Sequence, residues 1–481
     1  MTESEKLLMW RTRGGMAMRA ILFALSEDNA REAMLALARD KKIEIAAWLG
    51  TDKGHGVIDY DYGVLTREEI QKEIAMSCPP AVYDSVYGGL YRFLDMAYRN
   101  GTRPIYEYVN LFNLWLSFYY GLFQKKKPDV LIFSDIPHFG VDSIAKDLAN
   151  AMGIPVVMVQ QALGQDMFFA FSNIEDIGIY ESLANREEVE IELKKEFEKD
   201  LFYMKNTNVV VPGSSEKGSG KERLKKLWKK IQHNRGRIYT KGRLFALRKA
   251  GGYFSTKEER LASLLEAKRM FGKCSVDLTE NFVYFPLHLQ PELTTSALGG
   301  KFCDQILAIE RLREFIPEDW KIYVKENPKQ SYYMRGELFF RRLNNIKNVE
   351  YVPRSVNTYD LIRGAKFVAT ITGTAGWEAV SGGKPVLVFG LAWYRSLPGV
   401  FEYRHCKYNA EEIANFSIDH EAVSAAYNAL LSKAYPGIIE CGHEKALEIY
   451  SERENHKKIY DSMEKILAKV AEMLPNYGGG Q

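Results

Sequence analysis

Polar and small residues gather at three points in the second half of the chain, each where a strand-like apolar run ends. Residues 366–373 run into a turn of small residues at 373–376, and the runs 281–288 and 321–328 end in polar segments. The carboxyl ends of parallel strands lie on one edge of a sheet, so we expect these segments to meet. Together they offer an imidazole, carboxylates, amides, an amine and a near-naked backbone, which suits a phosphate-bearing ligand. The candidate ligand-binding residues are His288, Gln290, Glu292, Lys325, Glu326, Asn327, Thr372, Gly373, Thr374, Ala375 and Gly376.

The turn at 373–376 is the feature best suited to an anion. Trp377 begins a helical pattern after it, and a helix N-terminus presents unpaired N–H groups with a partial positive charge. The alternative is a tight strand–helix connection without a ligand, because the sequence is neither a Walker A loop nor G-x-G-x-x-G. His288 also has two interpretations, a phosphate contact or proton-transfer group and an ordinary loop histidine. Three polar strand ends on one edge favour a ligand site.

The first half of the chain supplies candidates for acid–base or nucleophilic chemistry. Asp135 and His138 follow the apolar run 127–135, and Asp166 follows the run 154–161. A carboxylate or an imidazole at such a strand end is a candidate base, acid or nucleophile. Asp135 has the alternative of capping the following helix. The spacing does not choose between Asp135 and Asp166.

Metal and cofactor sites are not predicted. The five cysteines are scattered and form no C-x-x-C pair, which argues against a zinc site or a disulfide framework. A D-x-D pair, Asp59 and Asp61, is too short a motif to indicate a divalent cation.

Strand-like and helical patterns alternate in both halves of the 481-residue chain. This alternation predicts an α/β protein with two doubly wound parallel-sheet domains. We expect a first domain at 1–275, a second domain at 276–445, and a C-terminal helix and tail at 446–481. No apolar run approaches the length of a membrane span, and the N-terminus lacks the apolar core of a secretory signal. We therefore expect a cytoplasmic protein.

A basic insertion is expected at 213–250. Thirteen Lys or Arg and a single acidic residue, Glu222, lie between 217 and 249, in a chain whose net charge is +3. The apolar residues of 222–231, including Trp228, recur at helical spacing. Among functional interpretations an anionic membrane surface ranks first, and a solvated insertion is an equal alternative. No nucleic-acid-binding module is recognisable, so we predict no nucleic-acid partner.

Four segments of the second half resemble the bacterial capsule polysaccharide biosynthesis proteins, a family that includes the β-Kdo glycosyltransferases. The segments are "YFPLHLQPE", "KIYVKENP", "VEYVP…NTYDLI" and "FVATITGTAGWEAVSGGKPVLVFG". The likeness covers roughly 280–400, and the first half matches only in its strand pattern.

The resemblance implies the two-domain GT-B architecture, with the domains facing a cleft and the last helix crossing back to the first domain. It implies that the second domain holds a CMP-activated ulosonic acid, such as Kdo or a nonulosonic acid, and that the first holds a glycan or lipid-linked acceptor. His288, Gln290, Lys325, Glu326 and the 373–376 turn would then face the nucleotide. Peripheral contact with the inner face of the membrane would fit such an acceptor.

The sequence departs from the resembled transferases at one strand of the first domain. Where they usually carry an acidic stretch, this chain has Gln160 and Gln161. The catalytic role would then move to Asp135 or Asp166, and retention or inversion stays open. A sugar-nucleotide epimerase and a non-catalytic glycan-binding protein of capsule assembly are the alternative functions.

Overall fold

The computed structural model describes residues 17–25, 28–51, 55–62, 70, 78–99, 105–138, 140–197, 264–270, 274, 276–330, 335–447 and 450–474. The basic segment 213–250 and the tail after residue 474 lie outside the described residues, so the membrane interpretation stays a prediction.

The first sheet is doubly wound and parallel except at one edge. Its spatial order is β13 (Tyr435–Pro436), β6 (Met167–Phe171), β5 (Val156–Gln161), β4 (Val130–Phe133), β1 (Met18–Phe23), β2 (Ile43–Gly50) and β3 (Tyr60–Asp61). Strand β6 is antiparallel to β5, and β13 is antiparallel to β6. The central strands are continuous apolar runs because helices cover a parallel sheet on both faces; β4, for example, is buried throughout.

The second sheet is wholly parallel among the described residues. Its order is β12 (Val400–Glu402), β11 (Val386–Val388), β10 (Val368–Thr370), β7 (Phe282–Pro286), β8 (Lys321–Lys325) and β9 (Val349–Val352). The predicted fold class, with two doubly wound α/β domains, is therefore confirmed. The antiparallel edge of the first sheet is an addition that the sequence patterns did not indicate.

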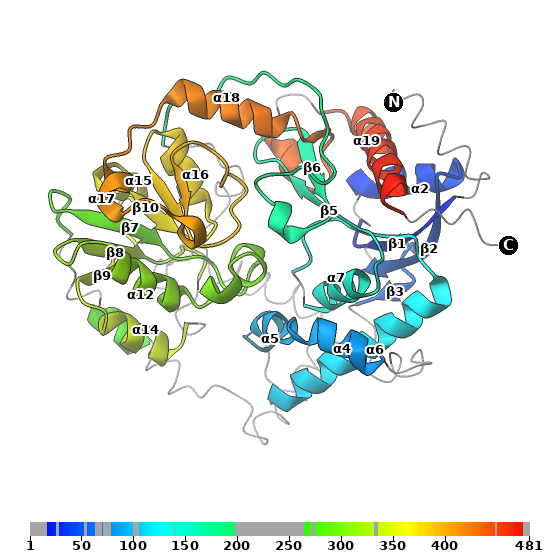
Figure 1. Cartoon of the computed structure of the whole chain (residues 1–481), viewed down its shortest axis with the longest axis horizontal. Helices are drawn as coiled ribbons and strands as arrows, with labels where there is room; N and C mark the ends of the chain where they lie inside the picture. Colours follow the sequence, from blue (N-terminus) through cyan, green and yellow to red (C-terminus); the bar gives the residue numbers. More distant parts are fainter. Residues whose placement is uncertain are drawn as a thin grey trace, which may run out of the picture.

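Helices cover both sheets, and Figure 1 shows the two halves side by side. The described helices of the first half are α2 (Asp28–Arg39), α4 (Pro80–Tyr87), α5 (Leu90–Arg99), α6 (Ile105–Lys126) and α7 (Val141–Ala151). Those of the second half are α12 (Gln305–Phe315), α14 (Glu337–Asn344), α15 (Thr358–Gly364), α16 (Thr374–Ser381), α17 (Ala410–Ala414) and α18 (His420–Leu431). No helix in the described part of the chain is long and apolar enough to cross a membrane.

The last helix, α19 (Glu452–Met473), returns to the first domain and packs beside α2 (Figure 1). Its apolar face, including Ile459, Met463 and Leu467, joins the core on one face of the first sheet. On its polar face the Lys458 amine lies 2.7 Å from the Asp166 carboxylate. The predicted crossing back of the C-terminal helix is confirmed.

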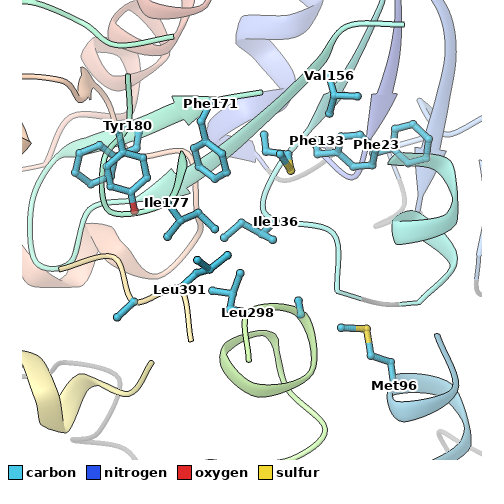
Figure 2. Close-up of a cluster of buried hydrophobic side chains, with 14 of the residues drawn as sticks. Phe23, Met96, Phe133, Ile136, Val156, Phe171, Ile177, Tyr180, Leu298 and Leu391 are labelled. Carbon is cyan, nitrogen blue, oxygen red and sulfur yellow. The ribbon is translucent and has the colours of Figure 1, made fainter. Parts of the chain in front are cut away.

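One apolar cluster runs from the first sheet into the second half of the chain (Figure 2). Phe133 of β4 and the following Ile136 lie at one end, and Leu298 and Leu391, from loops of the second domain, lie at the other. All four are buried. The two domains are therefore held together by a shared core, as well as by the chain that connects them.

Candidate functional site

A cavity of about 540 Å³ lies where the carboxyl ends of the two sheets face each other. The first domain contributes Gln160, Gln161 and Phe169. The second contributes the segment after β7 and the start of α16. Of the candidate residues named from the sequence, those that line the cavity are His288, Glu292, Asn327, Gly373, Thr374 and Ala375.

The N-terminus of α16 opens onto this cavity without a side-chain cap. Gly373 is its N-cap residue, and Thr374 and Ala375 form the first positions of the helix. The Tyr394 hydroxyl donates to the Gly373 carbonyl at 2.5 Å, which fixes the turn from behind. Gly376 serves packing, because a Cβ there would collide with that hydroxyl. The uncapped N–H groups are suited to an anion.

His288 lies beside this helix terminus and is 5% exposed. Its Nε2 accepts from the backbone N–H of Thr372 at 3.2 Å, so the proton of the neutral ring is on Nδ1. Burial, and next to it the charge of Arg335, lower the pKa of His288 to about 3. The Nδ1 atom is buried and has no hydrogen-bond partner among the described residues. His288 is thus a neutral imidazole with an N–H donor left unused at the cavity wall.

A buried ion pair supports His288 from below. The Arg335 guanidinium lies 2.8 Å from the Glu326 carboxylate, and their side chains are 1% and 0% exposed. Arg335 also donates to the His288 carbonyl at 2.5 Å, and the Tyr351 hydroxyl donates to Glu326 at 3.1 Å. The network fixes the backbone that carries the imidazole.

Several other candidates from the sequence also point into the scaffold. The Gln290 side chain donates to the Cys303 carbonyl at 2.7 Å. Lys325 donates to the Val356 carbonyl and the Thr358 hydroxyl, each at 2.7 Å, and burial lowers the pKa of Lys325 to about 8. The Thr372 hydroxyl donates to the Thr294 carbonyl at 2.6 Å. Contact of Gln290, Lys325, Glu326 or Thr372 with a ligand stays a prediction.

The two remaining second-domain candidates, Glu292 and Asn327, reach the cavity. Glu292 accepts from the Thr294 backbone N–H at 3.1 Å and so caps the short π-helical turn at Leu293–Ala297. Lys329, which the sequence reasoning did not single out, lies two residues after Asn327 and lines the cavity as well. It brings a cation to the same wall as His288.

The first-domain candidates do not come together. Asp135 accepts from its neighbour's backbone N–H at 2.7 Å, and its other oxygen lies 3.8 Å from Nδ1 of His138. Burial raises the pKa of Asp135 to about 7; the neighbouring His138 opposes this, and the charge of Glu440 adds to it. Asp166 pairs with Lys458 of α19. None of the three lines the cavity described above, and their catalytic roles stay predictions.

The segment after β13 contributes residues that sequence reasoning missed. Glu440, Cys441 and His443 line the cavity, and Glu440 lies 3.4 Å from Nε2 of His443. They carry no recognisable motif. The only signal would have been that the chain must return to the first domain before its last helix.

Aromatic side chains complete the wall between the two domains. Phe169 and Tyr180 stack with ring centroids 3.9 Å apart, and Trp393 and Tyr427 approach from the second domain. The Tyr180 hydroxyl donates to the Gln160 side chain at 2.6 Å. Such a surface of rings and amides suits a sugar, which offers C–H faces and hydroxyls. No group of three or more His, Cys, Asp or Glu placed to hold a metal ion occurs within the described ranges.

The architecture and the cavity define a two-domain α/β protein with a phosphate-suited wall on one side and carboxylates on the other. Residues 272–435 match the family model described as capsule polysaccharide biosynthesis protein. The resemblance predicted from the four motifs is therefore confirmed for this part of the chain. No curated protein matches the chain.

Among solved structures, the chain is similar to the β-Kdo 2,7 transferase of Thermosulfurimonas dismutans KpsC. The identity is 14% and the TM-score 0.31, over 72% of this chain and 88% of that one. It is also similar to the UDP-GlcNAc 2-epimerase of Methanocaldococcus jannaschii, with 10% identity and a TM-score of 0.22, over 86% and 93% of the two chains. At these TM-scores neither likeness decides between a transferase and an epimerase.

Proposed function

We propose that this protein is a glycosyltransferase of capsular or surface polysaccharide assembly. It transfers an ulosonic acid from a CMP-activated donor to a glycan or lipid-linked acceptor, and it does so without a metal ion or another cofactor. The family match at 272–435 supports the pathway. The observation that carries the proposed chemistry is the unused Nδ1–H of neutral His288 beside the uncapped start of α16.

The reaction needs stabilisation of a leaving phosphate. As the bond between the anomeric carbon and the phosphate oxygen breaks, negative charge builds on the CMP. N–H donors already in place stabilise that charge without having to reorganise. The α16 terminus, His288 Nδ1–H and the Lys329 amine supply such donors along one wall. A neutral histidine suits the role, since its proton stays on Nδ1 throughout.

The placement of the cavity also supports transfer. It lies between the domains, with the acceptor side formed by β5, β6 and the segment after β13. A site enclosed between two domains excludes water, which would otherwise hydrolyse the donor. The epimerase alternative needs no acceptor and takes a UDP-sugar, so substrate choice separates the two functions.

Thermal unfolding with nucleotides tests the proposal. CMP and CMP-Kdo are expected to raise the Tm of the wild-type protein, and UDP-GlcNAc at equal concentration is expected to raise it less. The His288→Phe variant keeps an aromatic ring but removes the Nδ1 donor, and it should lose the CMP-dependent shift. A Tm that responds to UDP-GlcNAc and not to CMP or any CMP-sugar would refute the proposed donor.

A further inference from the structure

A carboxylate from the far end of the chain reaches the acceptor side of the cavity. Among the described residues that line the cavity, the carboxylates are Glu292 and Glu440. Glu292 accepts from the backbone N–H and hydroxyl of Thr294 and so is occupied as a helix cap next to the phosphate wall. Glu440 follows β13 and belongs to the opposite wall.

Gln161 fixes the backbone that carries Glu440. This side chain is 8% exposed and lies at the carboxyl end of β5. Its Oε1 accepts from the backbone N–H groups of Ile439 and Glu440, at 2.9 and 3.4 Å. Its Nε2 donates to the Met167 carbonyl at 2.8 Å. One buried amide thus joins two strands and the return segment, which sets where Glu440 begins.

The Glu440 side chain itself is open to a substrate. It is 56% exposed, and its nearest charged partner is His443, with 3.4 Å between Oε2 and Nε2. The Asp135 carboxyl behind the wall accepts from the Ile136 backbone and does not line the cavity. Asp166 is turned toward Lys458. Of the first-domain-side carboxylates considered, Glu440 is the one that reaches the cavity.

We propose that Glu440 is a catalytic residue that accepts the proton of the acceptor hydroxyl. This assignment rests on the proposed transferase function and deepens it. A new bond forms between the acceptor oxygen and the anomeric carbon, while the hydroxyl proton passes to the Glu440 carboxylate. The bond from that carbon, or from its covalent intermediate, to the leaving oxygen breaks, and CMP departs with the electron pair. A base for the acceptor is needed whether the configuration is inverted or retained.

Variants of Glu440 test the assignment with CMP-Kdo and CMP-N-acetylneuraminate as donors and glycerol as a small alcohol acceptor. Release of CMP and formation of the glyceryl glycoside are measured. Removal of a general base costs on the order of 100- to 10,000-fold in rate, so Glu440→Gln should lose at least about 100-fold in turnover. Its Tm shift with CMP should equal that of the wild type. The matched control is Glu454→Gln, an acidic residue in the first turn of α19, which should keep wild-type turnover.

A second variant separates chemistry from structure. In Glu440→Ala the space left by the side chain admits formate, which can accept the proton in its place, so added formate should restore part of the turnover. The Glu440 assignment is overturned if Glu440→Gln retains more than a tenth of wild-type turnover, or if formate restores nothing to a variant that binds CMP normally. Absence of wild-type turnover with both donors refutes the proposed function, and the Glu440 assignment falls with it.

Discussion

Replacing Arg335 with methionine is expected to destabilise the protein by about 3–5 kcal/mol, because it leaves a buried carboxylate without its charge partner. The Arg335 and Glu326 side chains are 1% and 0% exposed, so water cannot compensate for the loss. Glu326 would keep hydrogen bonds from the Tyr351 hydroxyl and the Asn327 backbone only. The same substitution also releases the His288 carbonyl.

A double variant tests whether the cost arises from the stranded charge. Glu326→Gln combined with Arg335→Met removes both charges, and it should recover most of the lost stability, since neutralising both partners of a buried pair is often close to neutral. Urea unfolding followed by tryptophan fluorescence gives the free energies. Arg342→Met is the control, because its ion pair with Asp304 is 44% and 37% exposed and contributes about 0–1 kcal/mol.

Two outcomes would refute this reasoning. A loss of less than about 1 kcal/mol in Arg335→Met would show that the pair is not buried in solution, since that is the range of an exposed pair. A double variant no more stable than Arg335→Met would show that lost packing, and not the stranded charge, causes the effect. In the stable double variant, weakened CMP binding would reveal how far the network supports His288.

Three further expectations follow from the titratable and charged groups. His288 should stay neutral with its proton on Nδ1 from pH 5 to 8, as seen by ¹⁵N NMR, because its pKa is about 3; a midpoint near 6.5 would contradict its burial. The pKa of Asp135, about 7, lies above that of the unfolded chain, so the stability this carboxyl contributes in acid is lost as pH rises from about 4 to 7. Asp135→Asn should therefore gain about 1–2 kcal/mol relative to the wild type across that range; parallel pH profiles would count against it. Deleting residues 217–249 should weaken binding to anionic liposomes in a flotation assay while CMP binding persists, and unchanged flotation would exclude the membrane interpretation.

The sequence predicts most of the second domain because each strand there is a short apolar run followed by polar residues. Strands β7, β8 and β10 lie where those runs occur. The parallel arrangement then places their carboxyl ends on one edge. This is why the strand pattern alone assigns His288 and Gly373, 85 positions apart, to the same site.

The orientation of individual side chains was beyond the sequence. Lys325, Glu326 and Asn327 are consecutive, yet of these only Asn327 lines the cavity. Near a strand end successive side chains point to opposite sides, and which of them faces a ligand depends on partners elsewhere in the fold. For Glu326 that partner is Arg335, nine residues on, and for Lys325 it is the segment before α15.

The return segment could not be found from local patterns either. Strand β13 has two residues, and it pairs with β6 more than 260 positions earlier in the chain. No periodicity is detectable over two residues, so the contact is set by tertiary packing. Glu440 therefore has no local feature that marks it, although it lies four residues after that strand.

The short strand β13 also bears on how this protein should be divided for expression. The family match ends at Tyr435, which is the first residue of β13 and pairs with Phe168 in the other domain. A fragment cut at the limits of the match would end on a buried tyrosine that has lost its sheet. It would carry the α16 wall but neither Gln161 nor Glu440. The unit recognised by sequence comparison is thus smaller than the unit that can fold and turn over substrate, and soluble expression should require the chain through α19.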